Sequence, residues 1–298
     1  MAAAPDPARF VDARQVRRNF SRAAAGYDAA AFLAREVDRR MLERLDYVRI
    51  APKRILDLGC STGASLTALR ERYRDARLVG ADFTLPMLQA ARREKTFLSR
   101  LMPFLKPQAA AFVAADAERL PLAHGSLGLI WSNLLLHWLD EPRPAFREAL
   151  RTLEVGGLFM FSTFGPDTLR ELAAAFGDGD AHRQRFTDMH DLGDMLVECG
   201  FADPVMDMEV LTLTYASVDD LVRELRVAGE GCAMTGRRKG LAGRGVWQRV
   251  RAALARLAQD GRIPATFEVV YGHAWKGEPK QTADGRAIVR FEPRKKPA

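Results

Sequence analysis

The 298-residue sequence has few cysteines and no long apolar run. Its three cysteines, Cys60, Cys199 and Cys232, have no spacing typical of a metal site, and this small, odd number suits a reducing cytoplasm. No apolar stretch approaches the ~20 residues that a membrane-spanning helix needs. The first residues also lack a basic start followed by an apolar stretch, so we expect no secretory signal. These absences favour a cytoplasmic protein without a membrane span or a metal site.

Basic residues are in excess, since 45 lysines and arginines against 38 acidic residues leave a formal net charge of +7. Part of this excess lies in the C-terminal tail, after Lys276. No basic stripe interleaved with aromatic residues is present, so nucleic-acid binding is not favoured. The charge is consistent with an acidic protein partner, which it would steer towards the surface, and equally with a solvated tail.

A glycine-containing loop follows the first predicted strand, in the sequence Arg54-Ile55-Leu56-Asp57-Leu58-Gly59-Cys60-Ser61-Thr62-Gly63. The apolar run predicts a strand covered on both faces, with Asp57 near its end. Gly59 and Gly63 permit a tight turn and a close approach of the backbone to a ligand. Ligands of open parallel sheets bind beyond the carboxyl ends of the strands, so we expect a nucleotide-like ligand at this loop.

Two other interpretations of the loop are possible. Residues 59–63 match the nucleophile elbow of α/β-hydrolases, with Ser61 as the nucleophile. They also resemble the dinucleotide-binding fingerprint, although Ser61 and Ala64 stand where glycines are expected. The hydrolase interpretation is disfavoured because few strands precede Ile55. In addition, the last histidine, His273, lies in a strand-like run rather than in a loop.

Acidic residues end the next two predicted strands. Asp82 follows Leu78-Val79-Gly80-Ala81, and a carboxylate there can accept hydrogen bonds from both hydroxyls of a ribose. Asp82 could instead cap the helix predicted to begin near Pro86. Asp116 follows an apolar run over residues 109–113 and could accept the exocyclic amine of adenine. Together with the glycine loop, these acids indicate an adenosine ligand.

A fourth predicted strand, Leu127-Gly128-Leu129-Ile130-Trp131-Ser132-Asn133, continues into residues 134–139. In this order, the segments resemble the glycine loop, ribose acid, adenine acid and post-strand-four motif of the class I S-adenosylmethionine-dependent methyltransferases. The resemblance extends over residues 16–276, and Ser61 replaces the middle glycine that is usual in the loop.

This resemblance implies an α/β, Rossmann-like fold with a seven-stranded sheet, helices on both faces and a helical cap insertion. It implies S-adenosylmethionine as the methyl donor and no metal. The expected cofactor-binding residues are Asp57, Gly59, Ser61, Gly63, Asp82, Asp116, Ala117 and Asn133.

The order of the predicted helices and strands divides the chain into five parts. Helical periodicity over residues 14–45 is interrupted at Gly26, Val155-Gly156-Gly157 reads as a turn, and residues 167–176 read as a helix. Two basic amphipathic helices, over residues 218–228 and 246–259, interrupt the core before its last strand. The predicted parts are an N-terminal tail with helices (1–52), a cofactor-binding core (53–215), a helical cap insertion (216–263), the last core strand (264–276) and a flexible basic tail (277–298).

Several segments outside these motifs resemble one family, the malonyl-acyl-carrier-protein O-methyltransferases of biotin synthesis. The segments are residues 20–24 with Tyr27-Asp28, then 132–138, 164–172, 225–229 and 264–268. The resemblance implies that the chain methylates the free carboxylate of a malonyl thioester carried on acyl-carrier protein, which is then its partner. The methyl ester would replace the charged carboxylate with a neutral, more apolar group, so that fatty-acid elongation can proceed.

Two alternatives to this activity stay open. The same segments resemble an arginine hydroxylase that acts as an assembly factor of respiratory complex I, and His137-Trp138 and residues 229–232 favour it slightly. The chain could also be a non-catalytic binding module, because a fold alone does not fix a function.

The candidate catalytic residues follow from the chemistry of a carboxylate acceptor. A carboxylate is already ionised at neutral pH and needs no general base, so the lack of an evident Ser/His/Asp set is consistent with O-methylation. It does need a cation, and bidentate arginine is the natural choice, which points to Arg223 and Arg226 on the first cap helix. Tyr27 could bind the cofactor or close the site. His137 could act as a base or be a structural residue at a helix end.

Overall fold

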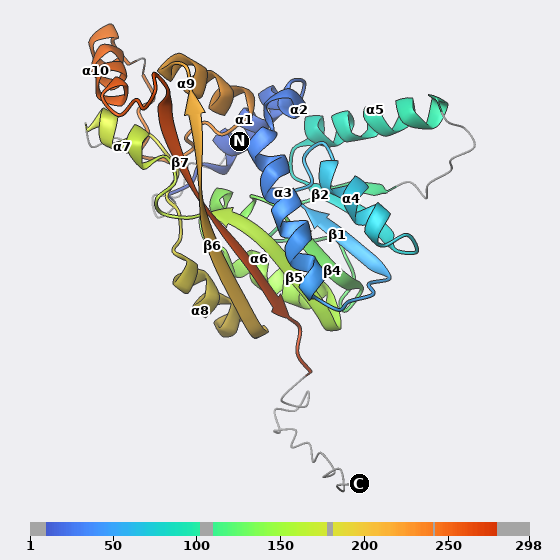
Figure 1. Cartoon of the computed structure of the whole chain (residues 1–298). Coiled ribbons are helices and arrows are strands. Elements are labelled where there is room, and N and C mark those ends of the chain that lie inside the picture. The colour runs from blue at the N-terminus through green and yellow to red at the C-terminus, as the bar shows by residue number, and fades with distance from the viewer. Residues whose placement is uncertain (1–9, 102–109, 178–180, 241, 279–298) are drawn as a thin grey trace, which may run out of the picture.

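The computed structural model describes residues 10–101, 110–177, 181–240 and 242–278 (Figure 1). The predicted basic tail over 277–298 therefore lies almost wholly outside the described residues, as does the start of the predicted N-terminal tail. Within the described residues, seven strands form one sheet in the order β3-β2-β1-β4-β5-β7-β6. The strands are β1 (Arg54–Leu58), β2 (Arg77–Asp82), β3 (Ala111–Ala114), β4 (Leu127–Ser132), β5 (Leu153–Phe164), β6 (Ala202–Tyr215) and β7 (Ile263–Trp275).

The first five strands run parallel, and β7 runs antiparallel to its neighbours β5 and β6. The parallel strands are apolar on both faces because helices cover both. In β1, for example, Ile55 packs into one core layer and the adjacent Leu56 into the other. This architecture confirms the predicted α/β fold class.

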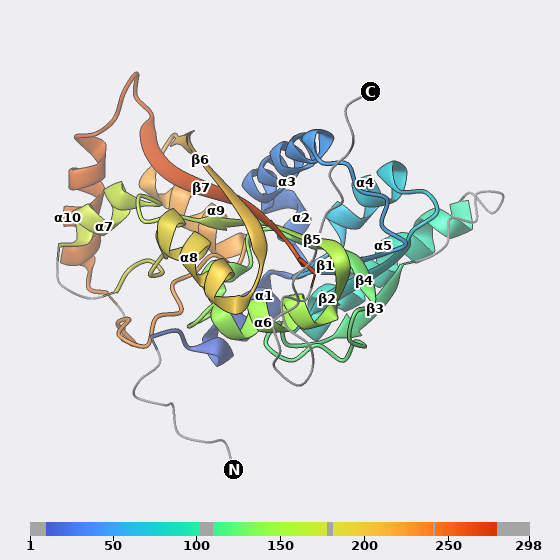
Figure 2. The same cartoon turned by 90° about the horizontal axis from the view of Figure 1, so that it is seen from below.

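Helices pack on each face of the sheet. α3 (Phe32–Arg44) and α4 (Ala64–Arg72) contribute Met41 and Leu69 to one core layer. α6 (Arg143–Thr152) and α8 (Met189–Cys199) contribute Phe146 and Leu196 to the other. Figure 2 shows α3 and α4 on one side of the strands and α6 on the opposite side. The remaining helical elements are α1 (Ala13–Ala23), α2 (Tyr27–Ala30), η1 (Leu45–Tyr47), α5 (Leu85–Leu101), η2 (Leu136–Trp138), α7 (Arg170–Phe176), α9 (Val218–Val227) and α10 (Arg244–Ala255).

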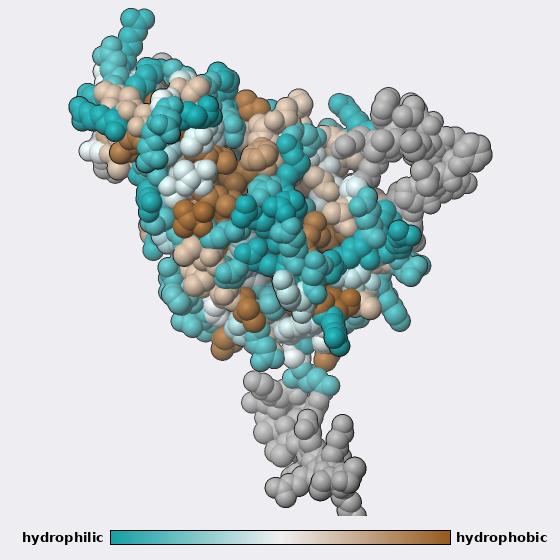
Figure 3. Space-filling view, viewed as in Figure 1, coloured by the Kyte–Doolittle hydropathy of each residue, from teal (hydrophilic) through white to brown (hydrophobic). Residues whose placement is uncertain are grey.

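The outer face of α3 is charged and is fixed to the edge strand β6. Arg40 forms ion pairs with Glu36 on α3 and with Glu209 on β6, and Arg44 pairs with Asp207. Figure 3 shows the hydrophilic surface that results over α3. The helix therefore presents apolar residues to the sheet and ion pairs to solvent, as expected for an amphipathic surface helix.

Three sequence expectations for local structure meet different outcomes. The helical region over residues 14–45 is interrupted at Gly26, as predicted, and again at Ala31. The predicted turn at residues 155–157 is wrong, because β5 continues through it. Gly156 adopts a φ of +77°, the register against β4 shifts there, and the strand carries a bulge instead of ending. The helix expected over residues 167–176 begins only at Arg170.

Further helices gather at one end of the sheet. α9 contacts both α1 and α2, and α10 contacts α7. Figure 1 shows α1, α2, α9 and α10 together at the end opposite to the one from which the C-terminal trace leaves. Among the helices that the structure describes, none is both long and apolar enough to cross a lipid bilayer.

Candidate functional site

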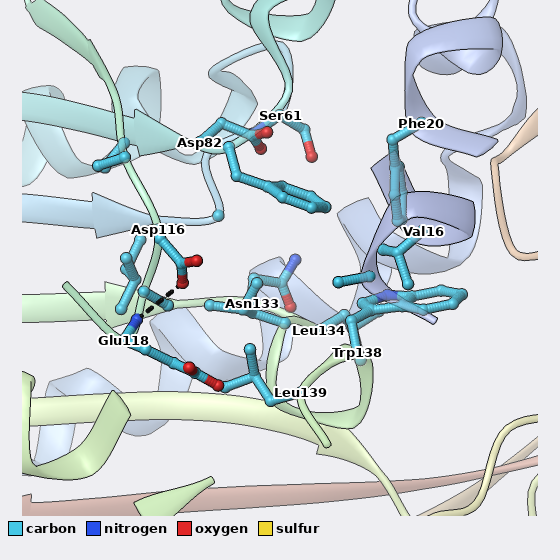
Figure 4. Close-up of a pocket in the computed structure, with 18 of the residues that line it drawn as sticks. Val16, Phe20, Ser61, Asp82, Asp116, Glu118, Asn133, Leu134, Trp138 and Leu139 are labelled. Atoms are coloured by element: carbon cyan, nitrogen blue, oxygen red, sulfur yellow. Dashed lines mark hydrogen bonds between the residues drawn. The ribbon is translucent and has the colours of Figure 1, made fainter. Parts of the chain in front are cut away.

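A cavity of about 1060 Å³, open to solvent, lies beyond the carboxyl ends of β1, β2 and β4 (Figure 4). We call it the first cavity. It brings together six of the eight residues predicted to bind the cofactor, which are Gly59, Ser61, Asp82, Asp116, Ala117 and Asn133. These residues come from the ends of four different strands, and the parallel topology places those ends at one edge.

The glycine loop turns sharply at the end of β1. Gly59 and Gly63 have φ angles of +80° and +84°, which glycine adopts without a steric penalty. The backbone N–H groups of Gly59 and Cys60 both donate to the carbonyl of Ala81, at 2.8 and 3.0 Å, and so bind the loop to β2. Ser61 also has a positive φ, +46°, at the position where the family's middle glycine is usual. A left-handed loop therefore forms here despite the serine.

Two predicted cofactor residues do not line this cavity. Asp57 is only 1% exposed and lies within β1, where it is in register with Gly80 and Trp131 of the neighbouring strands. Gly63 is the N-cap of α4. Asp57 therefore precedes the loop and Gly63 ends it, and a direct contact with the cofactor stays a prediction for both.

Asp82 is the buried acid of the first cavity. One carboxylate oxygen, Oδ2, accepts a hydrogen bond from the backbone N–H of Ser61 at 3.0 Å, and the other accepts from Thr84 N–H at 2.7 Å. Burial raises the pKa of Asp82, although these hydrogen bonds oppose the rise. Each carboxylate oxygen can accept two hydrogen bonds, so capacity is left for a ligand. Asp82 therefore combines the capping role, just before α5, with a place in the cavity wall.

Asp116 and Asn133 both line the first cavity but differ in their hydrogen bonding. Asp116 is exposed, and its carboxylate accepts a hydrogen bond from the backbone N–H of Glu118 (dashed in Figure 4). The amide of Asn133 donates to the carbonyl of Ala34 at 2.9 Å and accepts from the Ser162 hydroxyl at 2.7 Å. Asn133 thus links α3 and β5 at the cavity wall. This structural role is independent of any contact that Asn133 makes with a ligand.

The short helix α2 closes the first cavity on the side of the glycine loop. The Thr62 hydroxyl donates a 2.6 Å hydrogen bond to the carboxylate of Asp28. Tyr27 lines the cavity, and its pKa is raised far above the usual value, first by burial and then by the negative charge of Glu230. The phenol therefore stays protonated at physiological pH and can donate a hydrogen bond.

A second cavity of about 1240 Å³ adjoins the first, since Glu230 lines both. We call it the second cavity. Its lining combines apolar, mostly aromatic, residues with four arginines. The apolar residues include Phe164, Leu172, Phe176, Phe186, Trp247 and Phe267, and the arginines are Arg183, Arg226, Arg237 and Arg238.

His137 lines the second cavity and is almost completely buried. Its Nδ1 lies 3.3 Å from the Thr163 hydroxyl, and its Nε2 lies 3.9 Å from the carboxylate of Glu230. The ring also packs against Phe164, with 4.8 Å between the ring centroids. His137 is the middle residue of the short 3-10 helix η2, and its role as a base or as a structural residue stays a prediction.

The two arginines predicted on the first cap helix differ in their surroundings. Arg226 lines the second cavity. Arg223 lines neither cavity, forms an ion pair with Asp220, and has a side chain that is 68% exposed. The structure therefore places Tyr27 in the first cavity, His137 and Arg226 in the second, and Arg223 in neither.

Several lining residues were missed by the sequence analysis. Trp138 contributes a buried indole to the first cavity, and its Nε1 has no hydrogen-bond partner in the part of the chain that the structure describes. Gln184 and Arg183 reach the second cavity from a segment that is merely polar in sequence. That segment has no periodicity and no motif, so no signal in the sequence alone could have found these two residues.

Comparison with known proteins identifies the relatives of the chain. The methyltransferase domain family matches residues 56–161. A malonyl-acyl-carrier-protein O-methyltransferase of Laribacter hongkongensis is 50% identical over 289 residues, which cover 95% of this chain and 97% of the relative. A protein of the same name from Gallionella capsiferriformans is 46% identical over 282 residues, covering 94% and 96%. Among solved structures, the YcgJ protein of Bacillus subtilis aligns with a TM-score of 0.57 at 16% identity, covering 81% of this chain and 99% of that one, which supports the fold alone.

Proposed function

We propose that this chain, which belongs to the malonyl-acyl-carrier-protein O-methyltransferase family, methylates the free carboxylate of a malonyl group held as a thioester on acyl-carrier protein. The observation that carries the proposal is the pair of adjoining cavities. One has the glycine loop and a buried acid at the strand ends, and the other has four arginines. In this family the reaction is an early step of biotin synthesis.

The methyl donor is S-adenosylmethionine, and the first cavity fits it. Asp82 is buried there with capacity left to accept from ribose hydroxyls, and Asp116 is exposed at the wall, where its carboxylate can accept from an amine. Trp138 Nε1 offers a further donor that has no partner among the described residues. When bound, the cofactor supplies a sulfonium methyl group that is already electrophilic. We propose that Gly59, Ser61, Asp82, Asp116, Ala117 and Asn133 hold it, with Asp57 and Gly63 supporting the loop.

The protein then has mainly to align the acceptor and exclude water. A malonyl carboxylate arrives ionised, so no side chain has to remove a proton from it. Tyr27 keeps its proton and acts as a hydrogen-bond donor at the cavity wall, not as a base. His137, packed between Phe164 and Trp138, orients the acceptor from the side of the second cavity.

The second cavity provides the positive charge that an anionic acceptor needs. We propose Arg226 as the guanidinium that binds the malonyl carboxylate, because it lines this cavity. Arg223, which the sequence suggested equally, lines neither cavity and is paired with Asp220, and we assign it no role towards the substrate. The segment over residues 216–263 carries α9 and α10 and forms part of this wall, which supports its role as a cap. The apolar residues of the lining suit the thioester and the arm that carries it.

Two further parts of the proposal concern the protein partner and the cellular compartment. The partner is acyl-carrier protein in its malonyl form, and the proposed reaction needs no nucleic acid. We place the enzyme in the cytoplasm, because all three cysteines are free thiols, as in a reducing compartment. The arginine hydroxylase alternative is not supported, since relatives at 44–50% identity over most of the chain are named malonyl-acyl-carrier-protein O-methyltransferases.

A transfer assay tests the proposal. Purified protein and S-adenosylmethionine labelled in its methyl group should label malonyl-acyl-carrier protein and should leave the acetyl form, which lacks a free carboxylate, unlabelled. Replacing Arg226 with alanine should lower kcat/KM for the malonyl form about 10- to 100-fold, because a charge-assisted hydrogen bond is lost. Arg223→Ala, three residues away on the same helix, should stay within about twofold. Absence of label on every malonyl thioester would reject the proposal.

A further inference from the structure

We propose that Gln184 determines specificity by donating a hydrogen bond from its side-chain amide to the thioester carbonyl oxygen of the acceptor. This inference rests on the proposed function and assigns to one residue the recognition of a group next to the reacting carboxylate. Gln184 lines the second cavity and is only 6% exposed.

The orientation of the Gln184 amide is fixed by a backbone group. The N–H of Ala233 donates to Oε1 of Gln184 over 3.2 Å. A backbone N–H can only donate, so the atom that faces it must be the amide oxygen, and the NH₂ group takes the other position. That NH₂ has no hydrogen-bond partner among the residues that the structure describes. Because a buried donor without an acceptor is unfavourable and rare, a ligand oxygen is the natural partner.

A second set of contacts holds the backbone next to Gln184 and so restricts the position of its side-chain amide. The Cys232 thiol lies 3.4 Å from the carbonyl oxygen of Ala181 and 3.5 Å from that of Arg183. Arg183 itself donates to the carbonyls of Pro166 and Thr168 at the end of β5. The donor is thus preorganised before the substrate arrives, which favours selective binding.

The choice of ligand group follows from charge and position. The amide is neutral and its oxygen is already engaged, so it recognises an uncharged acceptor better than a carboxylate, for which the same cavity offers Arg226. His137 Nε2 is a second buried nitrogen of this wall without a hydrogen-bond partner in the described residues. The His137 ring packs against Phe164 and Phe186, which line the same cavity. A thioester carbonyl flanked by a methylene and a sulfur matches this combination of one polar contact and apolar surroundings.

Two acceptors that differ in one group test the inference. The first is malonyl-pantetheine, and the second is the corresponding carboxyethyl thioether, in which a methylene replaces the carbonyl. Wild-type protein should prefer the thioester about tenfold or more in kcat/KM, as expected for one hydrogen bond to a buried group. Gln184→Leu and Gln184→Glu should lose this preference through KM for the acceptor, with KM for S-adenosylmethionine unchanged. Gln248→Glu, at an exposed position on α10, should keep the preference.

A measurement on the unaltered protein guards against misfolded variants. The infrared carbonyl stretch of malonyl-pantetheine labelled with ¹³C at the thioester carbonyl should shift to lower frequency on binding to wild-type protein. An unshifted band, or a preference for the thioester that persists in a folded Gln184→Leu protein, would overturn the assignment to Gln184. If wild-type protein methylates neither acceptor nor malonyl-acyl-carrier protein, the proposed function itself fails, and this outcome differs from either of the others.

Discussion

The backbone N–H of Ser61 donates to the carboxylate of Asp82 over 3.0 Å, and this hydrogen bond joins the glycine loop after β1 to the acid that ends β2. The two motifs lie 21 residues apart in the sequence and work as one unit in the fold. Asp82 holds the loop with one oxygen and the start of α5 with the other, through Thr84 N–H. An acid at this position therefore shapes the wall of the first cavity before any ligand binds.

Replacing Asp82 with asparagine should weaken cofactor binding. Both oxygens of Asp82 accept from backbone N–H groups, so an amide NH₂ at one position must face a donor and leaves that group buried without an acceptor. We expect a loss of about 1–3 kcal/mol in the binding free energy of S-adenosylmethionine, measured by titration calorimetry. Asp75→Asn, at an exposed position before β2, is the matched control and should bind like the wild type. Equal affinity in both variants would show that Asp82 is only a helix cap.

The hydrogen bond between Thr62 and Asp28 gives a second prediction. Thr62→Val keeps the shape of the side chain and removes the hydroxyl that holds α2 against the glycine loop. We expect faster amide hydrogen exchange in α2 and a loss of about 1 kcal/mol in the free energy of unfolding. Thr62→Ser retains a hydroxyl and should protect α2 as the wild type does. If valine leaves exchange in α2 unchanged, packing alone holds this helix in place.

The order of the motifs along the chain was sufficient to predict the parallel core, because each motif ends a strand and parallel strand ends meet at one edge. The bulge in β5 could not be predicted, since Gly156 and Gly157 read as a turn from local preference alone. In the fold, the N–H of Gly156 donates to the carbonyl of Lys276, and Lys276 N–H donates to the carbonyl of Gly157. These hydrogen bonds come from a segment more than a hundred residues away, and they allow the strand to continue.

The residues that line the first cavity could be predicted more fully than those that line the second, for a similar reason. Gly59 and Asp82 lie in motifs whose geometry is local. Arg223 and Arg226 lie on one helix, and helical spacing cannot tell which of them faces a cavity until α9 is packed. Gln184 depends on a hydrogen bond to Ala233, which only the tertiary structure brings near.

Gly272 of β7 should tolerate no side chain. A Cβ atom built there would lie 2.3 Å from Cζ of Phe161, which is fully buried on the neighbouring strand. Gly272→Ala must therefore displace a packed aromatic ring, and we expect a loss of about 1–3 kcal/mol in the free energy of unfolding by urea. A Cβ at Gly236 meets no atom within 4 Å, so Gly236→Ala should change stability by less than about 0.5 kcal/mol. Equal stability of the two variants would mean that β7 shifts to accommodate the methyl group.

Asp38 of α3 supplies a prediction about pH. Its Oδ1 accepts hydrogen bonds from the Ser65 hydroxyl of α4 at 2.8 Å and from Trp131 Nε1 of β4 at 2.9 Å. Burial raises the pKa of Asp38 above its ordinary value of 3.8, although both hydrogen bonds oppose the rise. The folded protein therefore holds this proton more tightly than the unfolded chain does. Below pH 3.8 both states are protonated, and the group makes no pH-dependent contribution to stability. As the pH rises from 3.8 through the folded pKa, the free energy of unfolding falls, and it stays lower above that pKa.

Asparagine in place of Asp38 separates the charge from the hydrogen bonds. Asp38→Asn keeps an oxygen for Ser65 and Trp131 but cannot ionise, so its stability relative to wild type should increase between about pH 4 and neutral pH. Taking this difference cancels the titration of all other groups. Asp38→Leu removes the acceptor, leaves the indole N–H of Trp131 buried without a partner, and should lower stability by about 1–3 kcal/mol at neutral pH. Urea unfolding of the three proteins at several pH values measures these effects. If the difference between asparagine and wild type declines as the pH rises, the carboxylate stabilises the fold as an ion, and the pKa of Asp38 is lowered in the folded protein instead of raised.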